Sequence, residues 1–198
     1  MHAASRKLVW LNPNCKFDTN APAVFADRDG TLIRHVDYLG NPKQVSLLSG
    51  VRDAVHSLLN HGCPLYLFTN QSGVGRGYYD LQAVFRCNER MFDLAGIRAE
   101  ELAGICIATG LPDSGDPYRK PSPRFITEAL DYHALSTQQA HMIGDSKVDV
   151  EVAQNAGVHA WLVANGKPQT VKAHKRGELS GNYKFEPDFP TCVRLILS

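Results

Sequence analysis

The stretch Ala23 to Thr31, AVFADRDGT, decides the fold expected for this chain. Its four apolar residues, AVFA, come directly before two aspartates that are two positions apart, Asp27 and Asp29. A short continuous apolar run that ends in polar residues is typical of a parallel strand buried on both faces. Gly30 permits a tight turn in which the backbone can approach a ligand. We therefore expect a buried strand whose carboxyl end carries two carboxylates.

Four more runs of this kind follow along the chain, and helical patterns lie between them. The apolar runs span 64–68, 104–108, 141–144 and 158–163. Apolar residues at helix spacing predict helices within 51–59, 81–95, 122–130 and 148–156. Strands that alternate with helices indicate a parallel sheet with right-handed crossovers. We expect an α/β fold, a Rossmann-like parallel sheet flanked by helices.

The domain organisation expected from the sequence is simple. Residues 1–20 are interpreted as an N-terminal extension, and residues 21–198 as one globular domain. The 198 residues, of which 43% are hydrophobic, are enough for one well-buried core. Residues 166–187 are polar and locally basic, with Lys167 and Arg176 among their cations, and we expect a solvated loop there.

Charge and cysteine content exclude several classes of function. A net charge of +1 gives no global attraction to nucleic acid or to an anionic membrane. The five cysteines are an odd number without a CxxC pair, which favours reduced thiols over a disulfide framework. No run approaches the ~18 apolar residues of a membrane span, and no signal peptide is evident. We predict a cytoplasmic protein that does not bind membranes.

Three polar residues follow predicted strands and are expected to meet. Asp27, Thr69 and Asp145 each come directly after an apolar run. In open parallel sheets, ligands bind beyond the carboxyl ends of the strands. These side chains are therefore expected to lie at one edge of the sheet, in one site.

Paired carboxylates at such an edge point to metal-assisted chemistry on phosphate. Buried charges are costly unless a cation or hydrogen bonds compensate them. Mg²⁺ provides that compensation because it prefers hard oxygen ligands and phosphate. Asp27 could attack phosphorus, and Asp29 could protonate the leaving oxygen and later activate water. The spacing alone is a weak signal, but the preceding strand and the following Gly-Thr strengthen it.

Four ordered motifs carry a family resemblance. AVFADRDGTL, residues 23–32, resembles the first motif of the haloacid dehalogenase (HAD) superfamily of aspartate-nucleophile phosphatases. FTNQSG from Phe68, RKP from Arg119, and GDS from Gly144 resemble the second, third and fourth motifs. They cover residues 23–165, and their order is a specific signal. The stretches DRDGTL, TNQSGVGRGYY and YRKP are similar to the corresponding motifs of the histidinol-phosphate and heptose-bisphosphate phosphatase branch.

The resemblance implies a role for each residue of the catalytic group. Asp27 would be the nucleophile and Asp29 the general acid/base. Mg²⁺ would be bound by the Asp27 carboxylate, the Asp29 backbone carbonyl and Asp145. Lys120 would neutralise the charge of the nucleophile and phosphate, and Asp149 would order the metal shell or Lys120.

The resemblance also implies residues that bind the substrate. The Thr69 hydroxyl and the Asn70 amide would hold the transferring phosphoryl group. Arg76 and Arg119 would face the substrate and contact a second phosphate or sugar hydroxyls, a role that suits the planar guanidinium. For either arginine, an exposed loop position or a structural ion pair is the competing interpretation.

One departure from the branch concerns its zinc loop. That branch carries Cys-x-His and then Cys-x-Cys before Arg-Lys-Pro. Here Cys106 is followed by Ala108 at the histidine position, and Asp116 and Tyr118 replace the second cysteine pair. One thiol cannot hold a tetrahedral zinc. We predict no structural zinc and a shorter loop at 109–118.

A full cap domain does not fit the spacing between motifs. Only about 40 residues separate the first and second motifs, and about 50 separate the second and third. We expect a flap at 32–49, with His35, Asp37 and Tyr38, and an open site.

Several alternatives remain at this stage. The leading hypothesis is a sugar-bisphosphate phosphatase of heptose type acting on a small phosphorylated metabolite, as a monomer or small homo-oligomer. Histidinol-phosphate phosphatase is the runner-up, and a polynucleotide 3′-phosphatase is a distant third. A non-enzymatic phospho-receiver or binding module also uses an acidic Mg²⁺ cluster, but the second carboxylate, Asp29, argues for hydrolysis. A dinucleotide loop at Gly73–Gly77 has the wrong glycine spacing.

Overall fold

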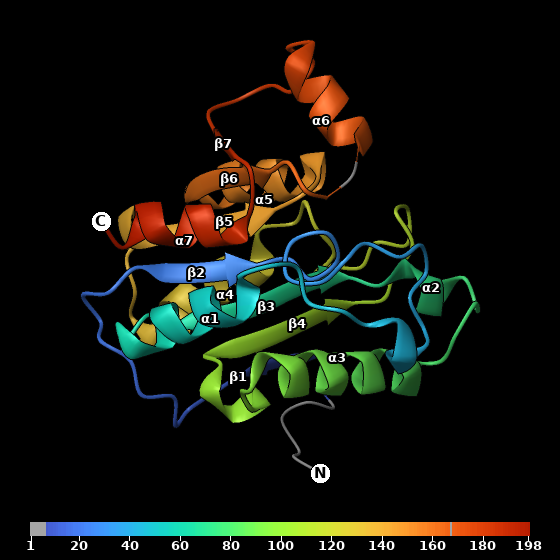
Figure 1. Cartoon of the computed structure of the whole chain (residues 1–198), viewed down its shortest axis with the longest axis horizontal. Coiled ribbons are helices and arrows are strands. Elements are labelled where there is room, and N and C mark those ends of the chain that lie inside the picture. Colours follow the sequence, from blue (N-terminus) through green and yellow to red (C-terminus); the bar gives the residue numbers. More distant parts are fainter. Residues whose placement is uncertain (1–6, 167) are drawn as a thin grey trace.

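A computed structural model describes residues 7–166 and 168–198 as an α/β fold (Figure 1). Within these residues, seven strands form one sheet in the order β1-β4-β3-β2-β5-β6-β7. All neighbouring strands are parallel except the β1–β4 pair at one edge. The strands are β1 (Val9–Leu11), β2 (Ala23–Ala26), β3 (Leu65–Asn70), β4 (Gly104–Ala108), β5 (Ala140–Gly144), β6 (His159–Val163) and β7 (Lys184–Glu186).

Helices cover both faces of the sheet. The α-helices of the described residues are α1 (Val51–Asn60), α2 (Ser72–Gly75), α3 (Leu81–Ala95), α4 (Arg124–His133), α5 (Lys147–Ala156), α6 (Pro168–Lys175) and α7 (Phe189–Ile196). Of these, α1, α3 and α7 cover one face and α4 and α5 cover the other, while α6 projects away from the sheet (Figure 1). Two clusters of buried apolar side chains form the core. One lies under α1, α3 and α7, and the other lies under α4 and α5. The α/β, Rossmann-like fold expected from the sequence is confirmed.

Helix ends follow local sequence signals. The Asp80 side chain accepts a hydrogen bond from Ala83 N–H and caps α3, which ends at Gly96 in the left-handed conformation. Gly157 ends α5 in the same way. The residues between the first two motifs hold the flap and α1, and no cap domain lies among them.

The expectation of a loop over 166–187 is wrong. Residues 168–175 form α6, and residues 184–186 form the edge strand β7. Only Thr170 of α6 is buried, so the helix shows little apolar periodicity in the sequence. Lys167 lies outside the described residues.

Short terminal elements add to the predicted sheet. Residues 9–11 of the expected N-terminal extension pair with β4 as the edge strand β1. The proposed domain boundary at residue 20 stays a prediction. Helix α7 packs on α1. The sequence analysis did not predict this helix.

The strand order places a topological switch point between β2 and β5. From β2 the chain adds β3 and then β4 on one side, and it then crosses to place β5 on the other side. In doubly wound sheets, the crevice at this point binds ligands because the crossovers diverge there. The carboxyl ends of β2 and β5 lead into Asp27 and Asp145. The fold therefore predicts a ligand site at these two residues.

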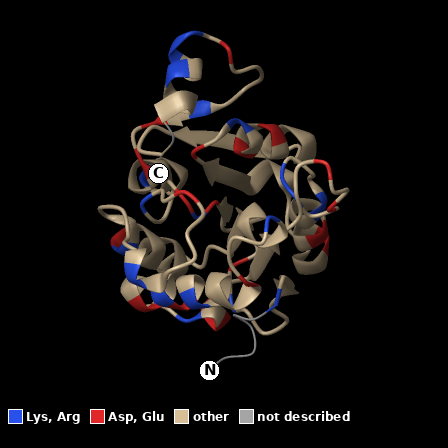
Figure 2. Ribbon diagram, turned by 90° about the vertical axis from the view of Figure 1, so that its right-hand side faces the viewer, with Lys and Arg blue, Asp and Glu red and all other residues tan. Residues whose placement is uncertain are grey.

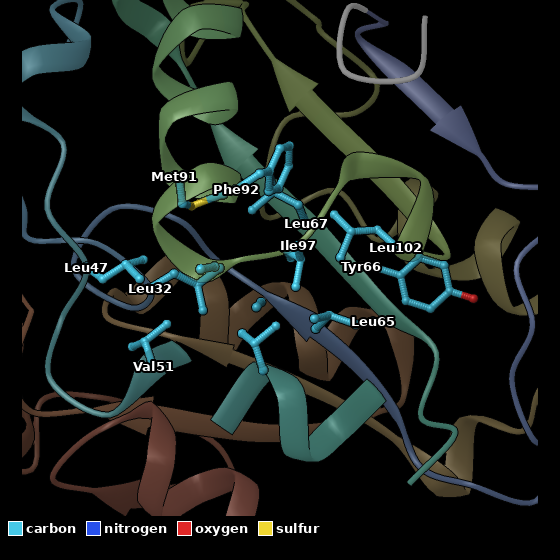
Figure 3. A pocket seen from close by; sticks show the side chains of 13 residues that line it. Leu32, Leu47, Val51, Leu65, Tyr66, Leu67, Met91, Phe92, Ile97 and Leu102 are labelled. Atoms are coloured by element: carbon cyan, nitrogen blue, oxygen red, sulfur yellow. The ribbon is translucent and has the colours of Figure 1, made fainter. Parts of the chain in front are cut away.

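The apolar core contains a small cavity of ≈ 20 Å³ (Figure 3). Side chains from α1, α3 and β3 line it, including Val51, Met91 and Leu67. A site of this size and polarity holds no ligand larger than a water molecule, and apolar cavities stay dry. The chemistry of the protein therefore lies elsewhere.

Surface charges are mixed along the helices, and basic residues gather on α6 (Figure 2). Among the described residues, no helix is long and apolar enough to cross a membrane.

Candidate active site

Three buried aspartates meet at the switch point. Asp27 follows β2, Asp145 follows β5, and Asp149 lies in the first turn of α5. Each offers a carboxylate oxygen, and these oxygens lie within 4.8 Å of one another. At most 7% of each residue is exposed. Such close carboxylates repel unless cations lie among them.

Lys120 supplies one of those cations. Its Nζ atom donates to Asp27 Oδ1 at 2.7 Å and to the Phe68 carbonyl oxygen at 2.9 Å, and it also pairs with Asp149 Oδ1. The Asn70 side chain holds the Lys120 backbone, because its Oδ1 accepts from Lys120 N–H and its Nδ2 donates to Lys120 O. The long loop that carries Lys120 is therefore fixed to the end of β3.

The charges of this group shift its pKa values. Burial raises the pKa of Asp27 to about 6, and Asp149 and Asp29 add to the rise while Lys120 opposes it. Burial alone would lower the pKa of Lys120, but Asp149 and Asp27 outweigh it and raise that pKa. Lys120 is therefore held as an ammonium, and Asp27 is a carboxylate that a further cation would stabilise.

A divalent cation fits this group. Three carboxylates face one ammonium, and hard oxygen ligands of this kind suit Mg²⁺. Both oxygens of Asp149 are engaged, one by Lys120 and the other by Ser146 N–H and Oγ. Asp149 thus orders Lys120 and the start of α5. The residues that could hold the ion are Asp27 and Asp145, as predicted from the sequence, with Asp29 nearby.

Two glycines bring the backbone close to Asp145. A Cβ atom on Gly30 would overlap the Asp145 carboxylate, and a Cβ atom on Gly166 would overlap the Asp145 side chain. Gly30 also has φ +85°, a left-handed conformation that favours glycine. The turn after Asp29 therefore closes around the acidic group because it has no side chain there.

Asp29 lies beside the three aspartates, at the wall of a cavity of ≈ 520 Å³. Its carboxylate pairs with Arg28 and accepts from Gln71 Nε2 at 2.8 Å. Gln71 Nε2 also donates to Thr69 Oγ1 at 2.9 Å. Thr69 is buried beneath this contact. Sequence analysis missed Arg28 and Gln71, although both lie inside quoted motifs.

Six segments of the described chain border the cavity. The flap contributes His35, Asp37 and Tyr38, and the start of α5 contributes Lys147. The other lining residues that bear on the chemistry are Asp27, Asp29, Asn70, Arg119, Lys120, Asp145 and Thr170. Thr170 belongs to α6, so the misassigned segment forms part of the wall.

The two predicted substrate arginines differ in position. Arg119 is half-buried, lines the cavity, and donates from Nη1 to the Gly110 carbonyl oxygen at 3.0 Å. Arg76 is exposed at the end of α2 and is not among the residues that line the cavity. Burial lowers the pKa of Arg119, and the charge of Arg76 lowers it further. The two guanidinium groups are therefore close enough for their charges to interact, but only Arg119 lines the cavity.

Hydrogen bonds of Asp116 close the loop at 109–118. Its carboxylate accepts from Gly110 N–H at 2.9 Å and from Tyr118 N–H at 3.0 Å. Cys106, in the middle of β4, is buried. The loop that carries Arg119 thus has an internal fastening of its own.

Comparison with known proteins identifies the family. A family model described as HAD-hydrolase-like matches residues 117–192. A D-glycero-D-manno-heptose-1,7-bisphosphate 7-phosphatase of Thermosynechococcus vestitus is 31% identical over 181 residues, covering 85% of this chain and 89% of the relative. The D-glycero-beta-D-manno-heptose-1,7-bisphosphate 7-phosphatase of Escherichia coli K12 is 32% identical over 168 residues, covering 80% and 87% of the two chains.

The chain belongs to the HAD-like phosphatase family. The family resemblance, and with it the assignment as a phosphoric monoester hydrolase, is confirmed. Among solved structures, this HAD-like phosphatase is similar to the D,D-heptose 1,7-bisphosphate phosphatase of B. bronchiseptica, a structure complexed with magnesium and phosphate. That likeness has a TM-score of 0.80 at 25% identity and covers 89% of this chain and 98% of the other.

Proposed function

We propose that this protein is a Mg²⁺-dependent phosphatase that forms a phospho-aspartate on Asp27. The observation that carries the proposal is the Lys120 ammonium between Asp27 and Asp149, beside a second carboxylate, Asp29, at the cavity wall. Phosphoryl transfer needs positioning and charge neutralisation above all. Bound Mg²⁺, held by Asp27, Asp145 and the backbone of Asp29, would supply charge neutralisation for the phosphate.

The residues of the chain account for each proton and bond. The Asp27 carboxylate attacks phosphorus while the bond from phosphorus to the leaving oxygen breaks. Asp29 gives its proton to that oxygen as the alcohol departs. A water molecule then attacks the phospho-aspartate and passes a proton to Asp29, which restores the Asp27 carboxylate and releases phosphate. Lys120 balances the charge of Asp27 throughout.

We propose a heptose 1,7-bisphosphate as substrate, with hydrolysis at the 7-phosphate. Relatives with this name match most of the chain, and a bisphosphate needs a second cationic contact away from Lys120. Arg119 lines the cavity and Arg76 lies near it, so their guanidinium groups suit the second phosphate or sugar hydroxyls. Thr69 and Asn70 would help to place the reacting phosphate through the end of β3. We also propose a cytoplasmic location, as predicted from the sequence.

The decisive experiment replaces the nucleophile. We expect Asp27→Asn to abolish turnover, because the amide cannot attack phosphorus, while the volume of the side chain stays the same. Steady-state phosphate release with Mg²⁺ measures this, and exposed Asp93→Asn on α3 is the matched control. Activity of Asp27→Asn within tenfold of the wild type would exclude Asp27 as nucleophile.

A substrate panel tests the second part. Initial rates are measured with Mg²⁺ on heptose and hexose bisphosphates, histidinol phosphate and a 3′-phosphorylated oligonucleotide. We expect the highest kcat/KM on the heptose bisphosphate. A higher value on histidinol phosphate would overturn the proposed substrate and leave the phosphatase mechanism intact.

A further inference from the structure

Arg28 lies between the two aspartates of the first motif, and its side chain is fully buried. Arginine is among the residues least often buried, because removing its charge from water is costly without partners. The chain nevertheless places this guanidinium under the active site. The hydrogen-bond partners of Arg28 show which side chains this buried charge keeps in place.

The guanidinium holds the Asp29 carboxylate in a fixed orientation. Nε donates to Asp29 Oδ2 at 3.0 Å, and Nη2 donates to Asp29 Oδ1 at 3.2 Å. This contact engages both carboxylate oxygens through one edge of the planar guanidinium, which is the strongest form of such a pair. Asp29 itself keeps 18% of its side chain exposed, at the wall of the cavity.

Asn88 of α3 fixes the other side of Arg28. Its Oδ1 accepts from Arg28 Nη1 at 2.8 Å, and the residue is fully buried. Among the described residues, Asn88 Nδ2 has no hydrogen-bond partner. Leaving a buried amide donor without a partner is destabilising, but an apolar residue at this position would leave Arg28 Nη1 without its acceptor. Asn88 therefore satisfies the buried guanidinium at a cost to its own hydrogen bonding.

Gln71 completes the support from the opposite side. Its Nε2 donates to Asp29 Oδ2 at 2.8 Å, and its Oε1 accepts from Tyr79 OH at 3.1 Å. Asp29 Oδ2 thus receives hydrogen bonds from two side chains, and Oδ1 receives one, from Arg28. Because Oδ1 is the less engaged oxygen, it is the atom on which a proton can be exchanged.

We propose that Arg28, anchored by Asn88, is a positioning residue that orients Asp29 for proton transfer to the leaving group. The inference rests on the proposed role of Asp29 as general acid/base. Arg28 does not touch the substrate, because its side chain is buried behind Asp29. Arg28 acts by fixing the direction in which the Asp29 carboxylate points.

The test separates this role from a purely structural one by varying the leaving group. A general acid matters most when the departing alkoxide is strongly basic, and little when it is a stable phenolate. We expect Arg28→Met to lower kcat/KM about 100-fold for an alkyl phosphate such as glycerol phosphate. For 2,4-dinitrophenyl phosphate we expect a loss of less than about threefold. The ratio kcat/KM is used because it reports the steps up to departure of the alcohol.

A double-mutant cycle identifies Asp29 as the route of the effect. If Arg28 acts through Asp29, adding Arg28→Met to Asp29→Asn should change kcat/KM for the alkyl phosphate by less than about threefold. Full multiplication of the two single losses would overturn the proposal. An equal loss on both leaving groups for Arg28→Met would overturn it as well.

Two further variants guard against a folding defect. Asn88→Ala removes only the anchor and should shift leaving-group dependence in the same direction, by about tenfold on the alkyl phosphate. It decides the question if Arg28→Met fails to fold, and unchanged dependence in folded Asn88→Ala would then overturn the proposal. Arg86→Met, at an exposed position of the same helix, is the control and should match the wild type. A failure of the proposed function would look different, because Asp27→Asn would then remain active.

Discussion

His141 lies at the end of the sheet opposite the active site. Its environment disfavours the protonated ring, which affects stability and not catalysis. His141 is the second residue of β5, its ring stacks on His159, and its Nδ1 accepts from Trp161 Nε1 at 3.0 Å. Lys184 lies over the Trp161 ring. Burial, followed by the charges of His159 and Lys184, lowers the pKa of His141 from 6.5 to about 4. The neutral ring is therefore part of the folded structure.

This pKa predicts a loss of stability in mild acid. Between pH 6.5 and about 4, the unfolded chain binds a proton at His141 and the folded chain does not. The free energy of unfolding should therefore fall as pH falls through this window, by up to roughly 3 kcal/mol. Urea unfolding at pH 4 to 7 measures this fall, which should be smaller in His141→Gln. Exposed His61→Gln is the control and should follow the wild type, and an equal slope in His141→Gln would refute the assignment.

The loop at 109–118 is the element that connects the edge of the sheet to substrate binding. Its fastening comes from Asp116, which binds Gly110 N–H and Tyr118 N–H, and Arg119 binds the Gly110 carbonyl oxygen. The position of Arg119 therefore depends on the closure of this loop. The sequence showed that the zinc ligands of the related branch are absent from this loop. The hydrogen bonds of Asp116 account for how the loop is held in the structure.

Loosening the loop should weaken substrate binding more than chemistry. We expect Asp116→Ala to raise KM for the bisphosphate about tenfold, since hydrogen bonds of this kind contribute about 1 kcal/mol each. The value of kcat should stay within about twofold, because Lys120 is held separately by Asn70. Exposed Asp113→Ala in the same loop should change neither constant. A tenfold fall in kcat without a change in KM would contradict this role of Asp116.

The absence of zinc ligands in this loop is a separate prediction. Metal analysis of the purified wild type should give no stoichiometric zinc.

For the whole molecule, the acidic group at the switch point links metal binding to stability. Three buried carboxylates with one ammonium destabilise the metal-free fold, so a bound divalent cation should stabilise it. Saturating Mg²⁺ at about 100 times its Kd should add about 2.7 kcal/mol. For a chain of this size, that corresponds to a rise in Tm of roughly 5–10 °C.

Thermal unfolding with and without Mg²⁺ tests this link without any assay of activity. Asp145→Asn should remove the Mg²⁺-dependent rise in Tm, because it removes a carboxylate at the carboxyl end of β5. Exposed Asp53→Asn on α1 should keep the rise. A Tm that does not respond to Mg²⁺ in the wild type, or that responds equally in Asp145→Asn, would exclude this site as the metal site.

The sequence by itself determined the alternation of strands and helices, the family and the residues of the acidic group. These follow from local signals: apolar runs, cap residues such as Asp80, and motifs in which chemistry sits directly after a strand. The expected roles of Asp27, Asp29, Lys120 and Asp145 stay predictions, and the structure brings the four residues together.

Only the tertiary structure decided the contacts that depend on distant partners. Arg28 meets Asn88 across 60 positions, and the Asn70 side chain meets the backbone of Lys120 across 50 positions. No local pattern marks such pairs, because the free energy that forms them comes from packing α3 and the Lys120 loop against the sheet. Helix α6 was missed for the same reason: it has one buried residue, Thr170, and its place at the cavity wall comes from contacts made by folding.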